Sequence, residues 1–131
     1  QKLDIYKRIS AIETEEEYMD MQDELMDRFG DIPRSVENLL KIAAIRALAH
    51  RAYVTEVVIN RQEVRLTMYQ KAKLQVEKIP DLVRSYKGDL KLVPADVPSF
   101  HYIDRRNKNQ DSLEMMGRAE GILKGMCGIR L

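Results

Sequence analysis

The stretch DELMDRFGDIPRSVENLL, residues 23–40, joins two predicted helices at a short corner. Gly30 can adopt the left-handed conformation that commonly ends a helix, and Pro33 suits a helix start, where its missing N–H needs no partner. Upstream of the corner, apolar residues recur at helical spacing and predict a stripe that faces the core: Tyr18, Met21, Leu25 and Phe29.

The sequence marks where the helices around the corner begin and what they pack against. A T-x-x-E capping box, Thr14 to Glu17, predicts a helix over 14–29, and a shorter helix over 3–11 precedes it. The alanine-rich segment 33–52 predicts a third helix that packs closely against its neighbours.

Beyond residue 53 the hydrophobic pattern alternates, which is typical of strands. We expect a hairpin over 54–69, a helix that begins near Pro80 and ends at Gly88, a second hairpin over 90–93 and 99–103, and a last helix from Ser112 with Leu113, Met116 and Leu123 inward. The sequence therefore predicts an α+β fold: N-terminal helices packed with a small antiparallel sheet made from two hairpins, plus a C-terminal helix, sharing one core.

The amino-acid composition limits the class of protein to which the chain can belong. The chain has 131 residues, 44% of them hydrophobic and 33% charged, which predicts a single globular domain over 1–131. Its one cysteine, Cys127, cannot form an internal disulfide, and no apolar run is long enough to span a membrane, so we expect a cytoplasmic protein. Because the chain begins with Gln1, we expect a piece of a larger protein.

The two parts of the chain carry opposite charge. Residues 1–40 contain 11 acidic and 5 basic side chains, a net charge of −6, whereas residues 41–131 have a net charge of +7. Such asymmetry indicates polar interaction surfaces.

Patterns typical of catalytic sites are missing from the sequence. It contains neither G-x-x-x-x-G-K-[ST] nor G-x-G-x-x-G, and no Cys, His or acid stands at metal-ligand spacing from His50 or His101. We therefore expect no catalytic residues, no cofactor and no metal site, and no binding or hydrolysis of ATP.

The segments LDIYKRIS (3–10) and DELMDRFGDIPRSVENLL together resemble the C-terminal domain of bacterial transcription-repair coupling factors. The family pattern ELxDRFGxxP is matched by Leu25, Asp27, Arg28, Phe29, Gly30 and Pro33. The match covers about residues 3–52, and the remainder agrees only in its order of elements and its charge pattern.

The resemblance implies a regulatory role in a multidomain protein. Such proteins are ATP-driven translocases on double-stranded DNA that displace stalled RNA polymerase and recruit the excision-repair protein UvrA. ATP binding belongs to motor domains upstream. The C-terminal domain is expected to fold back on an N-terminal UvrB-like module of the same chain and to cover the surface that UvrA needs.

The resemblance also suggests where the contact lies. Glu24, Asp27 and Arg28 form a polar ridge beside the predicted apolar stripe, and we expect all three to be exposed. The ridge would complement a basic partner surface. The alternative is an ordinary solvated face in which Glu24 and Arg28 form an i,i+4 pair worth about 0.3–0.5 kcal/mol.

A second function stays open on the sequence alone. Basic side chains in two predicted loops could hold duplex DNA and make the chain a DNA-binding accessory domain: Lys71, Lys73, Arg105, Arg106 and Lys108. Few aromatic residues accompany them, so the sequence signal for nucleic acid is weak.

Overall fold

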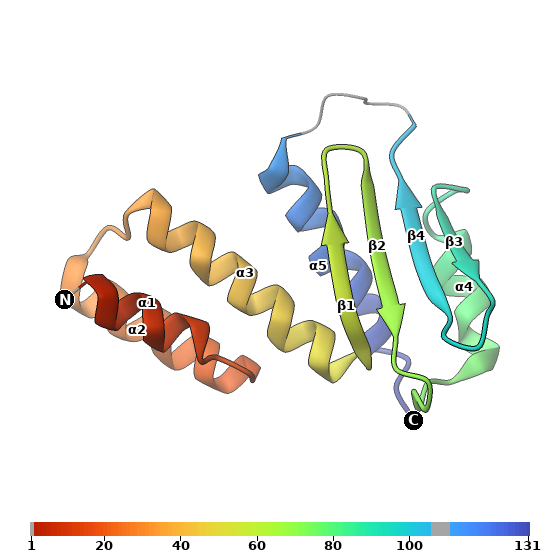
Figure 1. The fold of residues 1–131 in the computed structure, drawn as a ribbon, viewed down its shortest axis with the longest axis horizontal. Helices are drawn as coiled ribbons and strands as arrows, with labels where there is room; N and C mark the ends of the chain where they lie inside the picture. The colour runs from red at the N-terminus through yellow and green to blue at the C-terminus, as the bar shows by residue number, and fades with distance from the viewer. Residues whose placement is uncertain (1, 106–110) are drawn as a thin grey trace.

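The computed structural model describes residues 2–105 and 111–131, which form an α+β fold with five α-helices and a four-stranded antiparallel sheet (Figure 1). The elements in chain order are α1 (Lys2–Ser10), α2 (Glu15–Phe29), α3 (Arg34–Arg51), β1 (Val54–Ile59), β2 (Glu63–Met68), the 3-10 helix η1 (Val76–Lys78), α4 (Ile79–Arg84), β3 (Leu90–Val93), β4 (Ser99–Ile103) and α5 (Ser112–Cys127). The predicted fold class is confirmed. Among the described helices, none is both long and apolar enough to cross a bilayer.

The corner between α2 and α3 has the predicted geometry. The Thr14 side chain accepts a hydrogen bond from the Glu17 backbone N–H at 3.1 Å and so caps the start of α2. Gly30 adopts φ 68° and donates its N–H to Met26 O at 2.8 Å, which ends the helix. Pro33 immediately precedes α3.

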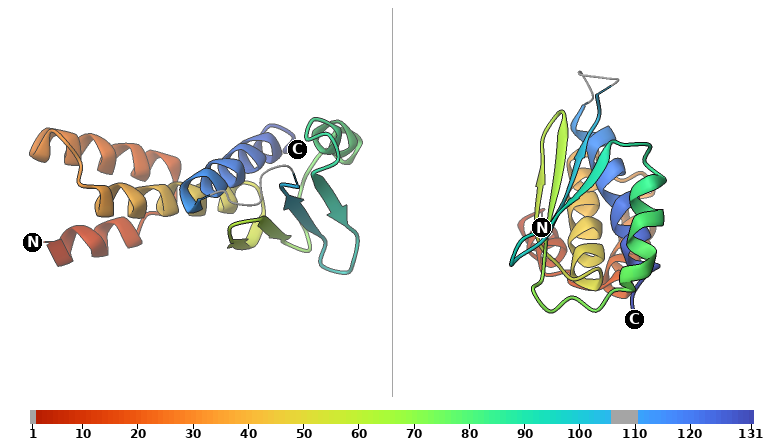
Figure 2. Two further views of the ribbon diagram at one scale, coloured as in Figure 1. Left: turned by 90° about the horizontal axis from the view of Figure 1, so that it is seen from above. Right: turned by 90° about the vertical axis from the view of Figure 1, so that its right-hand side faces the viewer.

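Both predicted hairpins exist, and pairing between β2 and β4 joins them into one sheet of order β1-β2-β4-β3. The turn between β1 and β2 is held by the Asn60 side chain, which accepts hydrogen bonds from the Gln62 and Glu63 N–H groups at 2.9 and 2.8 Å. Helices α3, α4 and α5 lie on one side of the sheet, and the opposite face is open among the described residues (Figure 2).

The buried apolar residues that the structure describes form two clusters rather than the single shared core expected. The helical cluster lies among α1, α2 and the first half of α3, and the larger cluster lies among the second half of α3, the sheet and α5. Helix α3 contributes Leu40 and Ala43 to the first and Ile45 and Leu48 to the second. It is therefore the continuous element that joins the two parts (Figure 1).

Two predicted core residues are exposed instead. Phe29 shares the face of Leu25, but it is the last residue of α2, where the chain turns away, and 51% of its surface is exposed. Leu113 lies two residues before the fully buried Met115, which places it about 200° around α5 from the core. Met116 is half-buried and Leu123 is buried, as predicted.

The glycines of α5 give a matched pair of stability predictions. Outside its own helical turn, a Cβ at Gly117 would meet no heavy atom of the described residues within 4 Å, whereas a Cβ at Gly125 would lie 2.7 Å from Leu82 Cδ1 of α4. We expect Gly117→Ala to raise the free energy of unfolding by roughly 0.5–1 kcal/mol through helix propensity. Gly125→Ala should gain less, because Leu82 must move. Urea denaturation of both variants checks this; a larger gain at Gly125 would contradict the packing described.

Candidate interaction surface

Helix α2 is fixed to both of its neighbouring helices by ion pairs near its two ends. The Arg8 guanidinium of α1 contacts the Glu24 carboxylate, and Arg51 at the end of α3 lies 2.7 Å from Glu15. Both pairs are partly exposed, so each contributes little to stability by itself. Together with the buried side chains of Met21 and Leu25, they fix which face of α2 points outward.

The outward face carries an uninterrupted acidic row. Glu16, Asp20, Asp23 and Asp27 are separated by four, three and four residues, the spacing that aligns side chains along one side of a helix. All four are exposed, and within the described residues none of them forms an ion pair. These four residues are called the acidic row below.

Apolar side chains accompany the acidic row. Met19 and Met26 of α2 are 61% and 52% exposed, and they lie seven residues apart on the side of α2 toward α3. Flexible methionines adapt to irregular partner surfaces. A partner that contacts this side of α2 would therefore meet carboxylates and apolar side chains together.

The ridge predicted from the sequence is only partly present. Asp27 and Arg28 are exposed as expected, but Glu24 is half-buried and turned toward α1, where it contacts Arg8 rather than Arg28. The expectation that Glu24 is exposed is therefore wrong, because α1 packs against that flank of α2. The helical spacing of the acidic row was visible in the sequence. That the acidic row points outward, whereas Glu24 does not, follows only from the position of α1.

The Arg8–Glu24 contact predicts a pH dependence of stability. The hydrogen bond from Arg8 lowers the pKa of Glu24 in the folded protein. A lowered carboxyl pKa contributes stability above the pKa of the unfolded chain, and this contribution disappears as the pH falls through the lower, folded pKa. We expect Glu24→Gln to lower Tm at pH 7 and to have a diminishing effect toward acidic pH.

The matched control for this prediction is Asp23→Asn, an exposed neighbour outside any ion pair of the described residues. Its effect on Tm should stay small over the same range of pH. Melting curves followed by circular dichroism provide the measurement. If Glu24→Gln lowers Tm equally at neutral and acidic pH, the Arg8–Glu24 ion pair is not the source of the loss of stability.

Among the described residues, the basic side chains considered for DNA binding do not form one surface. Lys71 and Lys73 are exposed just beyond the end of β2, whereas Arg105 is exposed beyond the end of β4, at the opposite end of the sheet (Figure 1). Arg106 and Lys108 lie outside the described residues. The described positions thus bring Lys71 and Lys73 together and leave Arg105 apart.

Two of the chemically reactive side chains, His101 and Cys127, have ordinary local partners. His101 lies 2.9 Å from the Ser99 hydroxyl on the sheet. Cys127 is half-buried with its Sγ 3.7 Å from Leu48 O, and burial raises the pKa of its thiol, which disfavours the reactive thiolate. His50 is exposed on α3.

Proteins with similar sequences are transcription-repair-coupling factors. The protein of that name from Bacillus subtilis (strain 168) is 30% identical over 132 residues, which cover 99% of this chain and 11% of the relative. The one from Staphylococcus haemolyticus is 39% identical over 75 residues, covering 57% of this chain and 6% of the relative. The chain thus spans about a tenth or less of the length of these relatives.

The fold and a family model agree with these similarities. A crystal structure of the C-terminal domain of a transcription-repair coupling factor matches with a TM-score of 0.69 and 20% identity, covering 98% of this chain and 80% of that one. The model of the TRCF domain family matches residues 1–79, which include α1, α2, α3 and the first hairpin. This chain belongs to the TRCF domain family.

Proposed function

We propose that this chain is a non-catalytic regulatory domain at the C-terminal end of a transcription-repair coupling factor, and that it holds the protein in an autoinhibited state. In this proposal it folds back on the N-terminal UvrB-like module and covers the surface that UvrA binds. The rest of the protein would be the ATP-dependent DNA translocase that displaces stalled RNA polymerase.

The observation that carries the proposal is the acidic row on α2. Four carboxylates on one exposed helix face, without ion pairs among the described residues, leave strong hydrogen-bond acceptors for a partner's arginine or lysine side chains. The implied basic surface of the UvrB-like module is complementary in charge. Met19 and Met26 add apolar contact area beside the row.

Autoinhibition by such a contact is expected to be reversible. Charged groups at a partly hydrated interface bind with modest affinity, and in one chain the linkage between the two modules raises their effective concentration. A molecule held closed in this way has a reduced apparent affinity for UvrA, in proportion to the small fraction that is open.

Calorimetric titration of this chain into the isolated UvrB-like module tests the proposal. We expect saturable one-to-one binding that weakens when salt is raised, because about 1 M salt shortens the screening length to about 3 Å. Absence of binding at low salt, with both proteins folded, would refute the proposed contact.

The DNA-binding alternative predicts a different titration. Lys71 and Lys73 are the only two of the five candidate basic residues that the described positions bring together, and so few phosphate contacts give weak binding. Affinity of this chain for duplex DNA that falls steeply with salt, together with no binding to the UvrB-like module, would favour the accessory DNA-binding function.

A further inference from the structure

Strand β1 is an edge of the sheet and, among the described residues, one of its hydrogen-bonding sides is open. In the order β1-β2-β4-β3 it has a strand partner on one side only among the described residues. Asn60 N–H donates to Glu63 O at 3.0 Å, and hydrogen-bonded and non-hydrogen-bonded pairs then alternate along the hairpin. The backbone N–H and C=O groups of Ile59 and Val57 therefore point away from β2.

A groove of about 590 Å³ lies along this open side, between β1 and α3. Its walls and floor are mainly apolar and come from three elements: Ile42 and Ile45 of α3, Val57 and Ile59 of β1, and Met116 of α5. Ile42 is 42% exposed, although it lies in the middle of a long helix. Unpaired strand edges beside apolar grooves are the surfaces to which extended peptides add as a further strand.

Among the described residues, the ionisable side chains that line the groove are one arginine and one histidine. Arg46 and His50 line it, and both follow Ile42 at intervals of four residues along α3, so the three form one row facing β1. Arg46 is oriented by its hydrogen bond to Ser10 O at 2.7 Å. An occupant that places a carboxylate beside two apolar side chains would match this row in both charge and polarity.

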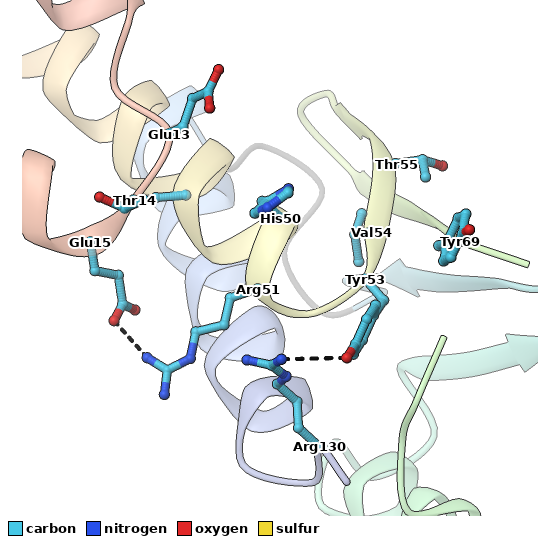
Figure 3. Close-up of a pocket in the computed structure, with 11 residues that line it drawn as sticks. Glu13, Thr14, Glu15, His50, Arg51, Tyr53, Val54, Thr55, Tyr69 and Arg130 are labelled. Atoms are coloured by element: carbon cyan, nitrogen blue, oxygen red, sulfur yellow. Dashed lines mark hydrogen bonds and ion pairs between the residues drawn. The ribbon is translucent and has the colours of Figure 1, made fainter. Parts of the chain in front are cut away.

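A neighbouring pocket, which shares His50, Val54 and Thr55 with the groove, is lined differently (Figure 3). In that pocket Arg51 is paired with Glu15, and Arg130 contacts Tyr53. The pairing of β1 with β2 also shifts register between Val54 and Glu56, and such bulges hinder further strand pairing. The open part of the edge is thus limited to residues 57–59.

We propose that the β1 edge binds an extended peptide segment of a partner protein, which adds as a fifth strand between β1 and α3. Every second side chain of that segment lies over α3 and α5; two of these are apolar and the next is a carboxylate beside Arg46 and His50. The site is separate from the acidic row of α2, and the proposal stands independently of the autoinhibitory contact.

The probe for a test is a capped seven-residue peptide with valine at the second and fourth positions, glutamate at the sixth and serine elsewhere. Because the peptide could pair with β1 in the parallel or the antiparallel direction, the peptide of reversed sequence is tested as well. NMR titration of the isotope-labelled chain should give saturable shifts at the amides of Val57, Val58 and Ile59 with one of the two peptides. Shifts confined to other regions, or absent with both peptides, would overturn the proposal.

Two variants distinguish backbone pairing from simple apolar contact. Val57→Pro removes one outward N–H, whereas Val57→Ala keeps it and removes only side-chain volume. We expect the proline variant to bind the peptide at least about tenfold more weakly than the alanine variant. Equal affinity of the two, with both folded by melting curve, would contradict strand addition.

The charge match is tested by a double-mutant cycle. Arg46→Gln should weaken binding of the glutamate peptide severalfold and leave binding of a glutamine-substituted peptide nearly unchanged. The cycle cancels the loss of the Arg46 bond to Ser10, because that loss is common to both titrations. Equal weakening for both peptides would contradict the proposed contact between Arg46 and a carboxylate of the peptide.

Concentration-dependent dimerisation through β1 without peptide would show that a second copy is the occupant, which also contradicts the proposal.

Discussion

Replacing Asp23 and Asp27 by lysine is expected to weaken binding of this chain to the UvrB-like module by at least about tenfold. Each lost charged hydrogen bond is worth roughly 1.5–3 kcal/mol, and about 1.4 kcal/mol corresponds to a factor of ten. The lysines also introduce repulsion against a basic surface. Both positions are exposed on α2, so the fold should be retained. Calorimetric titration gives the ratio of affinities.

The matched control reverses the same number of charges elsewhere. Glu77 and Asp96 are exposed in the part of the chain that contains the sheet, away from α2. Lysine at both positions should change affinity for the module only slightly, through long-range charge. An equal loss in the control and in the Asp23/Asp27 variant would show that net charge alone, and no surface on α2, drives the binding.

The second large effect concerns the core beneath the acidic row. Leu25 is 1% exposed and Met26, its neighbour on α2, is 52% exposed. We expect Leu25→Ala to lower the free energy of unfolding by about 2–5 kcal/mol, because it leaves a cavity among α1, α2 and α3. Met26→Ala should change it by no more than about 0.5 kcal/mol. Urea denaturation measures both, and equal effects would contradict the assigned core face.

Much of this architecture is encoded in local sequence signals. Thr14, Gly30 and Pro33 mark helix ends by backbone chemistry that acts within a few residues, and the alternating pattern over 54–69 reports a strand pair joined by a tight turn. For that reason the order of elements and the α+β class could be predicted. The family resemblance rests on residues in this same N-terminal part.

What could not be predicted depends on contacts between distant segments. The pairing of β2 with β4, and the division of the core at the middle of α3, are set by packing that periodicity does not report. The partner of Glu24 is Arg8, sixteen positions earlier, rather than Arg28 on its own helix. Likewise the groove beside β1 forms because α3 crosses near a strand edge that has no strand partner in the described part of the chain.

The most direct measurement of the central claim is competition between this chain and UvrA for the UvrB-like module. With the module immobilised, rising concentrations of this chain should displace UvrA, and the apparent Kd of UvrA should increase linearly with the concentration of free chain. The Asp23/Asp27 lysine variant should displace much less, and the Glu77/Asp96 lysine variant should displace as well as the unaltered chain. Simultaneous binding of UvrA and this chain to the module would contradict the proposal that the chain covers the UvrA surface.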